Sequence, residues 1–207
     1  MKKLLIPLIC LSIFGLAKAH EHRMCNVYLQ AGPQTQITAS IQQIGRLFHG
    51  TTADKIQQIF RFMAHLQHVS FDRAIFRKRT AHQIISDGTI SGCTDATIVF
   101  VALARACAIP AKYIETIDKE WLLSDGPSIS GHIYAEIYDA EQNQWILVDP
   151  TNKKRINGIP NNRVLFKIGL DSWDIGITDY ESLSQVYRLF KTQWLETNKR
   201  SNNHFNN

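Results

Sequence analysis

Residues 91–116 read SGCTDATIVFVALARACAIPAKYIET, and this stretch decides the fold. From Ala96 to Ala108 the only charged residue is Arg105. A helix that is apolar on nearly all sides has to be buried, because no face of it is suited to water. We therefore expect this run to form the central helix of the core and to end at Ile109-Pro110.

Cys93 stands at the start of this helix, after the turn residues Asp87-Gly88 and Ser91-Gly92. The first turn of a helix carries unpaired backbone N–H groups at the positive end of the helix dipole, which favours a thiolate over a thiol. This position makes Cys93 a candidate nucleophile. The alternative is a cysteine that only packs in the core, as a lone cysteine more often does.

Residues 1–19 have the pattern of a secretory signal peptide, with Lys2 and Lys3 before an apolar stretch and Ala17 and Ala19 at its end. The apolar stretch, residues 4–16, is shorter than the ~20 residues of a membrane-spanning helix. We therefore expect a mature chain from about His20 that is secreted or periplasmic, without stable insertion into a membrane.

The chain has 207 residues and a formal net charge of +5, part of which belongs to the leader. Basic clusters remain at Arg73, at 77–79 and at 153–155. They lack interleaved aromatic residues and any nucleic-acid motif, which is typical of a solvated surface, so we expect no nucleic-acid partner. The length of residues 20–195 suits a single domain.

Three cysteines, Cys25, Cys93 and Cys107, remain once the leader is removed. An odd number leaves at least one thiol free. Cys93 and Cys107 cannot pair if one helix carries both, because a rise of ~1.5 Å per residue separates them by about 20 Å. Either Cys25 joins Cys107 or all three are reduced, and both cases can leave Cys93 available.

Apolar residues at helical spacing predict two helices before the central one, at 34–48 and after Thr51, which forms an approximate capping box with Asp54. Thr80 is expected to cap a short helix that ends at the Asp87-Gly88 turn. A last amphipathic helix is expected near residues 180–195. Residues 196–207 are expected to form a disordered tail.

After Pro110 the pattern changes to that of strands, at residues 111–117, 132–138 and 144–148. The last two strands flank a polar hairpin loop at 139–143, so they should pair antiparallel. His132 begins one of them and Asp149 follows the other, which makes the two residues neighbours. Trp121 lies in the connection 118–131, which we expect to be a lid or a substrate wall.

A thiol nucleophile needs a base and a group that orients the base. Cys93, His132 and Asp149 supply one residue for each role. Four blocks in this order carry a family resemblance: Gly92–Asp95, Ala102–Thr116, Gly131–Glu136 and Trp145–Thr151. Together they resemble the transglutaminase-like core, which is related to papain-like cysteine proteases. The resemblance covers roughly residues 75–152.

This resemblance implies an α+β fold, in which a buried helix carrying the cysteine packs on a small antiparallel sheet, with additional N-terminal helices. It implies Cys93 as nucleophile, His132 as base and Asp149 as the orienting partner. The family often has a tryptophan where this chain has Tyr134, and a glycine where it has Ala108 before Ile-Pro. The candidate substrate-binding residues are Tyr134 and Trp121.

The sequence thus predicts a secreted thiol acyl-transfer enzyme that acts on protein or peptide amides. Water as acceptor gives a peptidase, amidase or deamidase, and an amine gives a transamidase. The alternative is a catalytically inactive module of the same fold that binds a polypeptide or an envelope component. A metal site at Cys93 and His132 would lack closely spaced ligands, so no metal or cofactor is expected. The sequence carries no signal of an oligomeric state.

Overall fold

The computed structural model describes residues 25–124, 126 and 128–204, so the expected leader at 1–19 lies outside the described residues. Its helices are α2 (Ala39–Gly45), α3 (Thr52–Met63), α4 (Ala81–Asp87), α5 (Cys93–Ala106), α6 (Lys119–Leu123) and α7 (Tyr180–His204). Its strands are β1 (Gln67–His68), β2 (Thr89–Ile90), β3 (Ala111–Asp118), β4 (Gly131–Asp139), β5 (Gln144–Asp149), β6 (Lys154–Ile156) and β7 (Arg163–Gly169).

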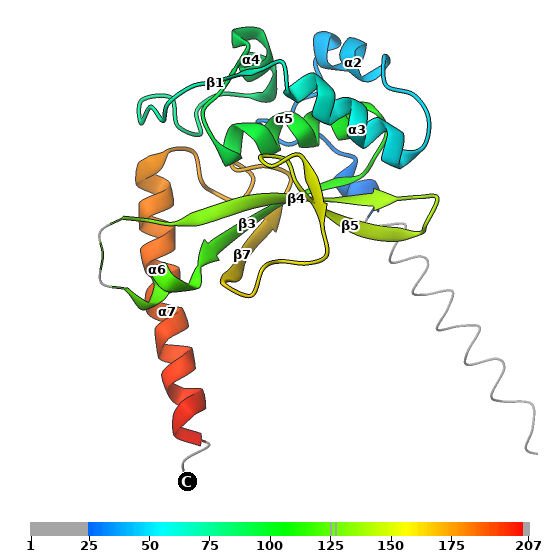
Figure 1. Ribbon diagram of the computed structural model, residues 1–207. Coiled ribbons are helices and arrows are strands. Elements are labelled where there is room, and N and C mark those ends of the chain that lie inside the picture. Colours follow the sequence, from blue (N-terminus) through cyan, green and yellow to red (C-terminus); the bar gives the residue numbers. More distant parts are fainter. Residues whose placement is uncertain (1–24, 125, 127, 205–207) are drawn as a thin grey trace, which may run out of the picture.

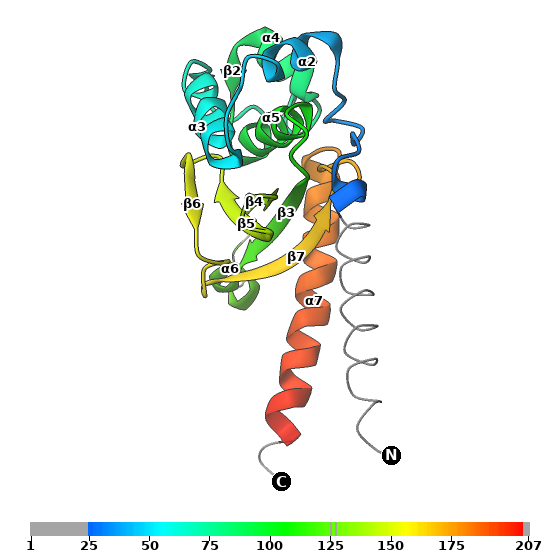
Figure 2. The ribbon, with the colours of Figure 1, turned by 90° about the vertical axis from the view of Figure 1, so that its right-hand side faces the viewer.

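The fold is α+β, as the sequence predicts. Five antiparallel strands form a sheet in the order β6-β5-β4-β3-β7. Helices α2 to α5 gather on one side of this sheet, and α7 runs past α6 and the β3 and β7 edge (Figures 1 and 2). No helix of the described part is both long and apolar enough to cross a membrane.

Helix α5 is the centre of the core, and its residues from Thr94 to Arg105 are all buried. It contacts α2, α3 and α4 on one side and strands β3 and β4 on the other. Arg105 is accommodated because its guanidinium donates to the backbone carbonyls of Tyr28, Ala111 and Leu170 and to the hydroxyl of Thr35. The one charge in the apolar run thus links α5 to the segment before α2, to the start of β3 and to the residue after β7.

The capping predictions for α3 and α4 are confirmed. Thr51 and Asp54 form a complete capping box, and Thr80 forms another with Gln83. Gly88 ends α4 in the left-handed conformation with φ 68°, which glycine adopts without a steric penalty.

The first helix is shorter than predicted, since α2 covers only Ala39–Gly45. Thr38 caps its N-terminus, and Gln34 and Thr35 lie buried before it in a bend of the chain. The backbone N–H groups of both residues donate to the carboxylate of Asp171. These long-range bonds replace the helical turn that the spacing of apolar residues favours.

The C-terminal part differs from the prediction in two respects. Strands β6 and β7, which follow Pro150, were not predicted, and β7 pairs with β3 along its length. Helix α7 does not end near residue 195 but continues to His204, so most of the expected disordered tail is helical. Phe166 of β7 contacts Tyr187 and Phe190 of α7, with ring centroids 5.2 and 5.1 Å apart, which anchors the upper part of this helix to the sheet.

Candidate active site

Cys93 is the first residue of α5 and is half-buried. The residue before it, Gly92, is the N-cap and makes no side-chain capping bond, so the first backbone N–H groups of α5 keep their hydrogen-bonding capacity. No disulfide joins Cys93, Cys107 or Cys25 to one another. The structure therefore presents a thiol at a helix N-terminus, where the dipole favours a negative charge.

Asp95 holds the turn in front of Cys93 in place. Its carboxylate accepts hydrogen bonds from the backbone N–H and the hydroxyl of Ser91, at 3.0 and 2.7 Å. It also forms a buried ion pair with Arg79. Because the guanidinium balances this carboxylate, the negative charge beside the thiol is not left unpaired.

His132 and Asp149 meet at the end of the β4–β5 hairpin. Nε2 of His132 lies 3.2 Å from Oδ2 of Asp149, and both side chains are largely buried. The hydroxyl of Thr116 donates to the backbone carbonyl of His132 at 2.7 Å and so holds the start of β4 against β3. Asn152 donates to both carboxylate oxygens of Asp149, at 3.1 and 2.7 Å, and fixes its orientation.

The electrostatics of this cluster favour a charged imidazole. Burial by itself lowers the pKa of His132, but contacts with Asp149 and Cys93 outweigh it and raise the pKa to about 9. Burial raises the pKa of Asp149, while His132 and Asn152 more than compensate and lower it to about 2. The arrangement therefore stabilises an imidazolium beside the Asp149 carboxylate at neutral pH.

The two candidate substrate-binding residues lie in different surroundings. Tyr134 is buried, with its ring centroid 4.8 Å from that of His132 in an edge-to-face arrangement, and it packs with Ile114 and Leu147 on the sheet face away from α5. Trp121 belongs to α6 and is 4% exposed, packed against Tyr187 at 5.9 Å between ring centroids. The structure thus places Tyr134 beside the imidazole and Trp121 in the contact between α6 and α7.

A cavity of about 200 Å³ opens beside the thiol. Cys93 and Thr94 line it together with residues of four other segments, while Trp121 and Tyr134 do not. Among the described residues, no group of three or more His, Cys, Asp or Glu side chains is placed to hold a metal ion.

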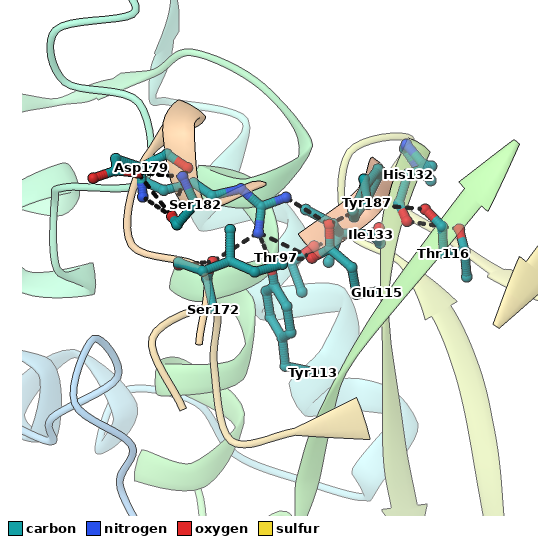
Figure 3. A network of polar contacts seen from close by, with 12 residues as sticks. Thr97, Tyr113, Glu115, Thr116, His132, Ile133, Ser172, Asp179, Ser182 and Tyr187 are labelled. Atoms are coloured by element: carbon teal, nitrogen blue, oxygen red, sulfur yellow. Dashed lines mark hydrogen bonds and ion pairs between the residues drawn. The ribbon is translucent and has the colours of Figure 1, made fainter. Parts of the chain in front are cut away.

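A network of buried polar side chains lies below this cavity, around Glu115 of β3 (Figure 3). Arg77 forms an ion pair with Glu115, with 2.6 Å between Nη2 and Oε1. The hydroxyls of Tyr113 and Tyr187 donate to the same carboxylate, at 2.9 and 2.5 Å. Arg77 also donates to Ser172 at 2.7 Å. The network ties β3, α7 and the segment before α4 together, and Arg77, Glu115 and Tyr187 line the same cavity as Cys93.

The prediction that cluster 77–79 is a solvated surface was wrong for its two arginines. Arg77 and Arg79 are 3% and 9% exposed, because each has a buried carboxylate partner, Glu115 or Asp95. Sequence reasoning missed both residues as parts of the site. The available signal was weak: Glu115 and Asp95 are acids inside apolar segments, and a buried acid needs a basic partner.

The model of the transglutaminase-like superfamily matches residues 42–150, more than half of the chain. The chain belongs to the transglutaminase-like superfamily. The match starts before the residues 75–152 that carry the resemblance, and it includes part of α2 and all of α3, which contact α5. No curated protein matches the chain in sequence.

The chain is similar to parts of solved structures. A candidate cysteine protease from Cytophaga hutchinsonii superposes with a TM-score of 0.53 and 20% identity, covering 72% of this chain and 48% of that protein. LapG from Legionella pneumophila has a TM-score of 0.41 and 13% identity, covering 74% of this chain and 94% of LapG. The chain spans about half the length of the Cytophaga protein, and the likeness to that protein concerns the fold alone.

Proposed function

We propose that this transglutaminase-like protein is a thiol hydrolase that cleaves amide bonds of a protein or peptide. The observation that supports the proposal is the placement of His132 in contact with both Asp149 and Cys93. Nε2 faces the carboxylate, which leaves Nδ1 to exchange a proton with the thiol. The three residues then act as nucleophile, base and orienting group.

In the first half-reaction the thiolate of Cys93 attacks the carbonyl carbon of the amide. The backbone N–H of Cys93 at the start of α5 donates to the developing oxyanion. The carbon–nitrogen bond breaks, the leaving amine takes a proton from the His132 imidazolium, and a thioester remains.

In the second half-reaction water adds to the thioester while His132 accepts its proton. The carbon–sulfur bond then breaks, which releases the carboxylic acid and restores the thiolate. We propose water rather than an amine as the acceptor, because water needs no second binding site. Residues 1–19 support action after export, in the periplasm or outside the cell.

The proposal is tested by alkylating the protein with iodoacetamide across a range of pH values and locating the label by mass spectrometry. Cys93 is expected to react fast near neutral pH, with His132→Ala removing the acceleration. Buried Cys107 is the internal control, since burial raises the pKa of its thiol and slows it. Labelling of Cys93 at the rate of an ordinary thiol would instead favour an inactive binding module.

The products of a peptide pool incubated with the protein identify the acceptor. New chain ends mean proteolysis, and conversion of a side-chain amide to an acid means deamidation. Isopeptide-linked pairs would show that an amine resolves the thioester and would contradict the hydrolytic outcome. Cys93→Ala is the control, because it removes the nucleophile and should form none of these products.

A further inference from the structure

The walls of the cavity beside Cys93 are apolar. Phe71 and Phe76 come from the segment before α4, and Tyr180 and Leu183 come from the first turns of α7. The three aromatic rings form one cluster, with centroids 5.2 to 6.3 Å apart. Ile129, from the connection before β4, lines the cavity as well. A side chain entering from the solvent would therefore meet mainly hydrocarbon.

The floor of the cavity carries no unbalanced charge. Arg77 and Glu115 both line it, and they form an ion pair that is 3% and 1% exposed at the side chains. The carboxylate is further satisfied by two tyrosine hydroxyls. A charged side chain entering here would lose its hydration without gaining a free counter-ion, which is costly. The cavity therefore disfavours charged residues.

Two polar atoms at the cavity lack a hydrogen-bond partner among the described residues: Oγ1 of Thr94 and Nε of Arg77. Both residues are buried, at 3% exposure each. Buried polar groups in folded proteins are normally satisfied, so these two lining residues have hydrogen-bonding capacity that the described part of the protein does not use.

The size of the cavity fits one side chain. Its volume of about 200 Å³ is below the roughly 300–1,000 Å³ typical of pockets for whole small molecules. Part of its wall, Tyr180 and Leu183, lies outside the family match at 42–150. The wall supplied by α7 is thus a feature of this chain beyond the shared core.

We propose that this cavity is a substrate subsite that binds one uncharged, apolar side chain of a polypeptide next to the amide that Cys93 attacks. The inference rests on the proposed function and adds the class of residue that the site selects.

The test measures how well pentapeptides protect Cys93 from iodoacetamide. The probes are N-acetyl-Gly-Gly-X-Gly-Gly-amides with X as Leu, Phe, Gly, Asp or Lys, so that X is the only side chain. Leu and Phe peptides are expected to protect at concentrations about tenfold lower than the others, since one apolar contact is worth roughly that factor. Equal protection by all five peptides would overturn the inference.

Variants of Ile129 locate the effect. Ile129→Trp fills the cavity and is expected to abolish the preference, whereas Ile129→Ala enlarges it and should favour Phe over Leu. Leu123→Trp is the matched control, because Leu123 is 69% exposed on the same connection and does not line the cavity. A preference that all three variants retain would show that the side chain binds elsewhere.

The readout separates the two proposals. The rate of alkylation without peptide reports on the proposed function, while the ratio of protecting concentrations reports on binding and needs no catalysis. Slow alkylation of Cys93 together with better protection by the Leu and Phe peptides would contradict the proposed function but support the subsite. Fast alkylation with equal protection by all peptides would support the proposed function and contradict the subsite.

Discussion

Nε2 of His132 contacts Oδ2 of Asp149 diagonally across the β4–β5 pair rather than from the facing position. The ladder ends at Ala135 opposite Val148, and its continuation places Tyr134 opposite Asp149. His132 lies two residues further, on the same face as Tyr134. Diagonal neighbours in antiparallel strands are within reach of long side chains. The antiparallel hairpin expected from the sequence thus brings the two residues together.

This contact predicts how activity depends on pH. His132 has a pKa of about 9 largely because Asp149 and Cys93 offset the effect of burial. Asp149→Asn removes one charge, so the basic limb of kcat/KM should fall from near 9 by about one to three units. Asn152→Ala leaves the carboxylate charge in place and should move the limb less. A basic limb unchanged in Asp149→Asn would contradict the assigned role.

The same shift predicts a pH-dependent stability. The pKa of His132 is raised above its ordinary value of 6.5, so its contribution is complete below about pH 6.5 and is lost as pH rises through 9. Relative to His132→Gln, the wild-type protein should lose about 2–3 kcal/mol of unfolding free energy between pH 6 and 10. Urea unfolding of both proteins at several pH values measures this difference. If the unfolding free energies of the two proteins changed with pH in parallel, folding would not raise the pKa of His132.

The central helix, its caps and the hairpin were predictable from sequence, because each depends on local signals. These signals each depend on residues close together in the sequence: the apolar run around Arg105, the capping residues Thr51 and Thr80, and the polar loop 139–143. The three proposed catalytic residues followed from the edges of these elements.

The remainder of the site depends on contacts between distant segments. Strand β7 forms because it pairs with β3, with a bulge between Glu115 and Thr116. Turn residues before it conceal its strand pattern in the sequence. Arg77 is buried only because Glu115 lies across from it in space. The residues near Arg77 in the sequence do not indicate this partner. A prediction from residue type alone therefore places Arg77 on the surface.

The buried ion pair predicts an asymmetry between single and double variants. Glu115→Gln leaves the Arg77 guanidinium buried without its counter-ion and should cost about 3–5 kcal/mol of unfolding free energy. Replacing both residues by methionine removes both charges and should cost less than the single change. Chemical denaturation of the three proteins gives the comparison. A double variant that is less stable than Glu115→Gln would mean that the unpaired guanidinium is not what destabilises the single variant.

The end of α5 predicts a stabilising substitution. Ala108 has φ 60°, the left-handed conformation in which a side chain costs about 1–2 kcal/mol. Ala108→Gly relieves this cost. Glycine also gives the unfolded chain more conformational entropy, which offsets part of the gain, so the variant should be more stable by about 0.5–1 kcal/mol. Gly88→Ala is the matched control, because Gly88 has φ 68° and open space around a Cβ. It should destabilise by about 1 kcal/mol, so that the two thermal midpoints move in opposite directions.

Gly131, directly before His132, predicts a variant that harms activity through position. A Cβ on Gly131 would lie 2.5 Å from the carbonyl oxygen of Thr116 and 2.7 Å from the hydroxyl of Tyr187. Because the carbonyl belongs to the β3 backbone, Gly131→Ala has to push the start of β4 and the His132 imidazole away from β3. A displacement of about 1 Å can cost roughly 100-fold in rate, so kcat/KM should fall by that order.

The control for this variant is Gly158→Ala, since a Cβ there meets no atom within 4 Å. It should leave both kcat/KM and the thermal midpoint unchanged. In Gly131→Ala the alkylation rate of Cys93 should fall together with kcat/KM, because the imidazole no longer supports the thiolate. If Gly131→Ala kept the rapid alkylation of wild type, the close approach of β4 to β3 would not be what positions His132.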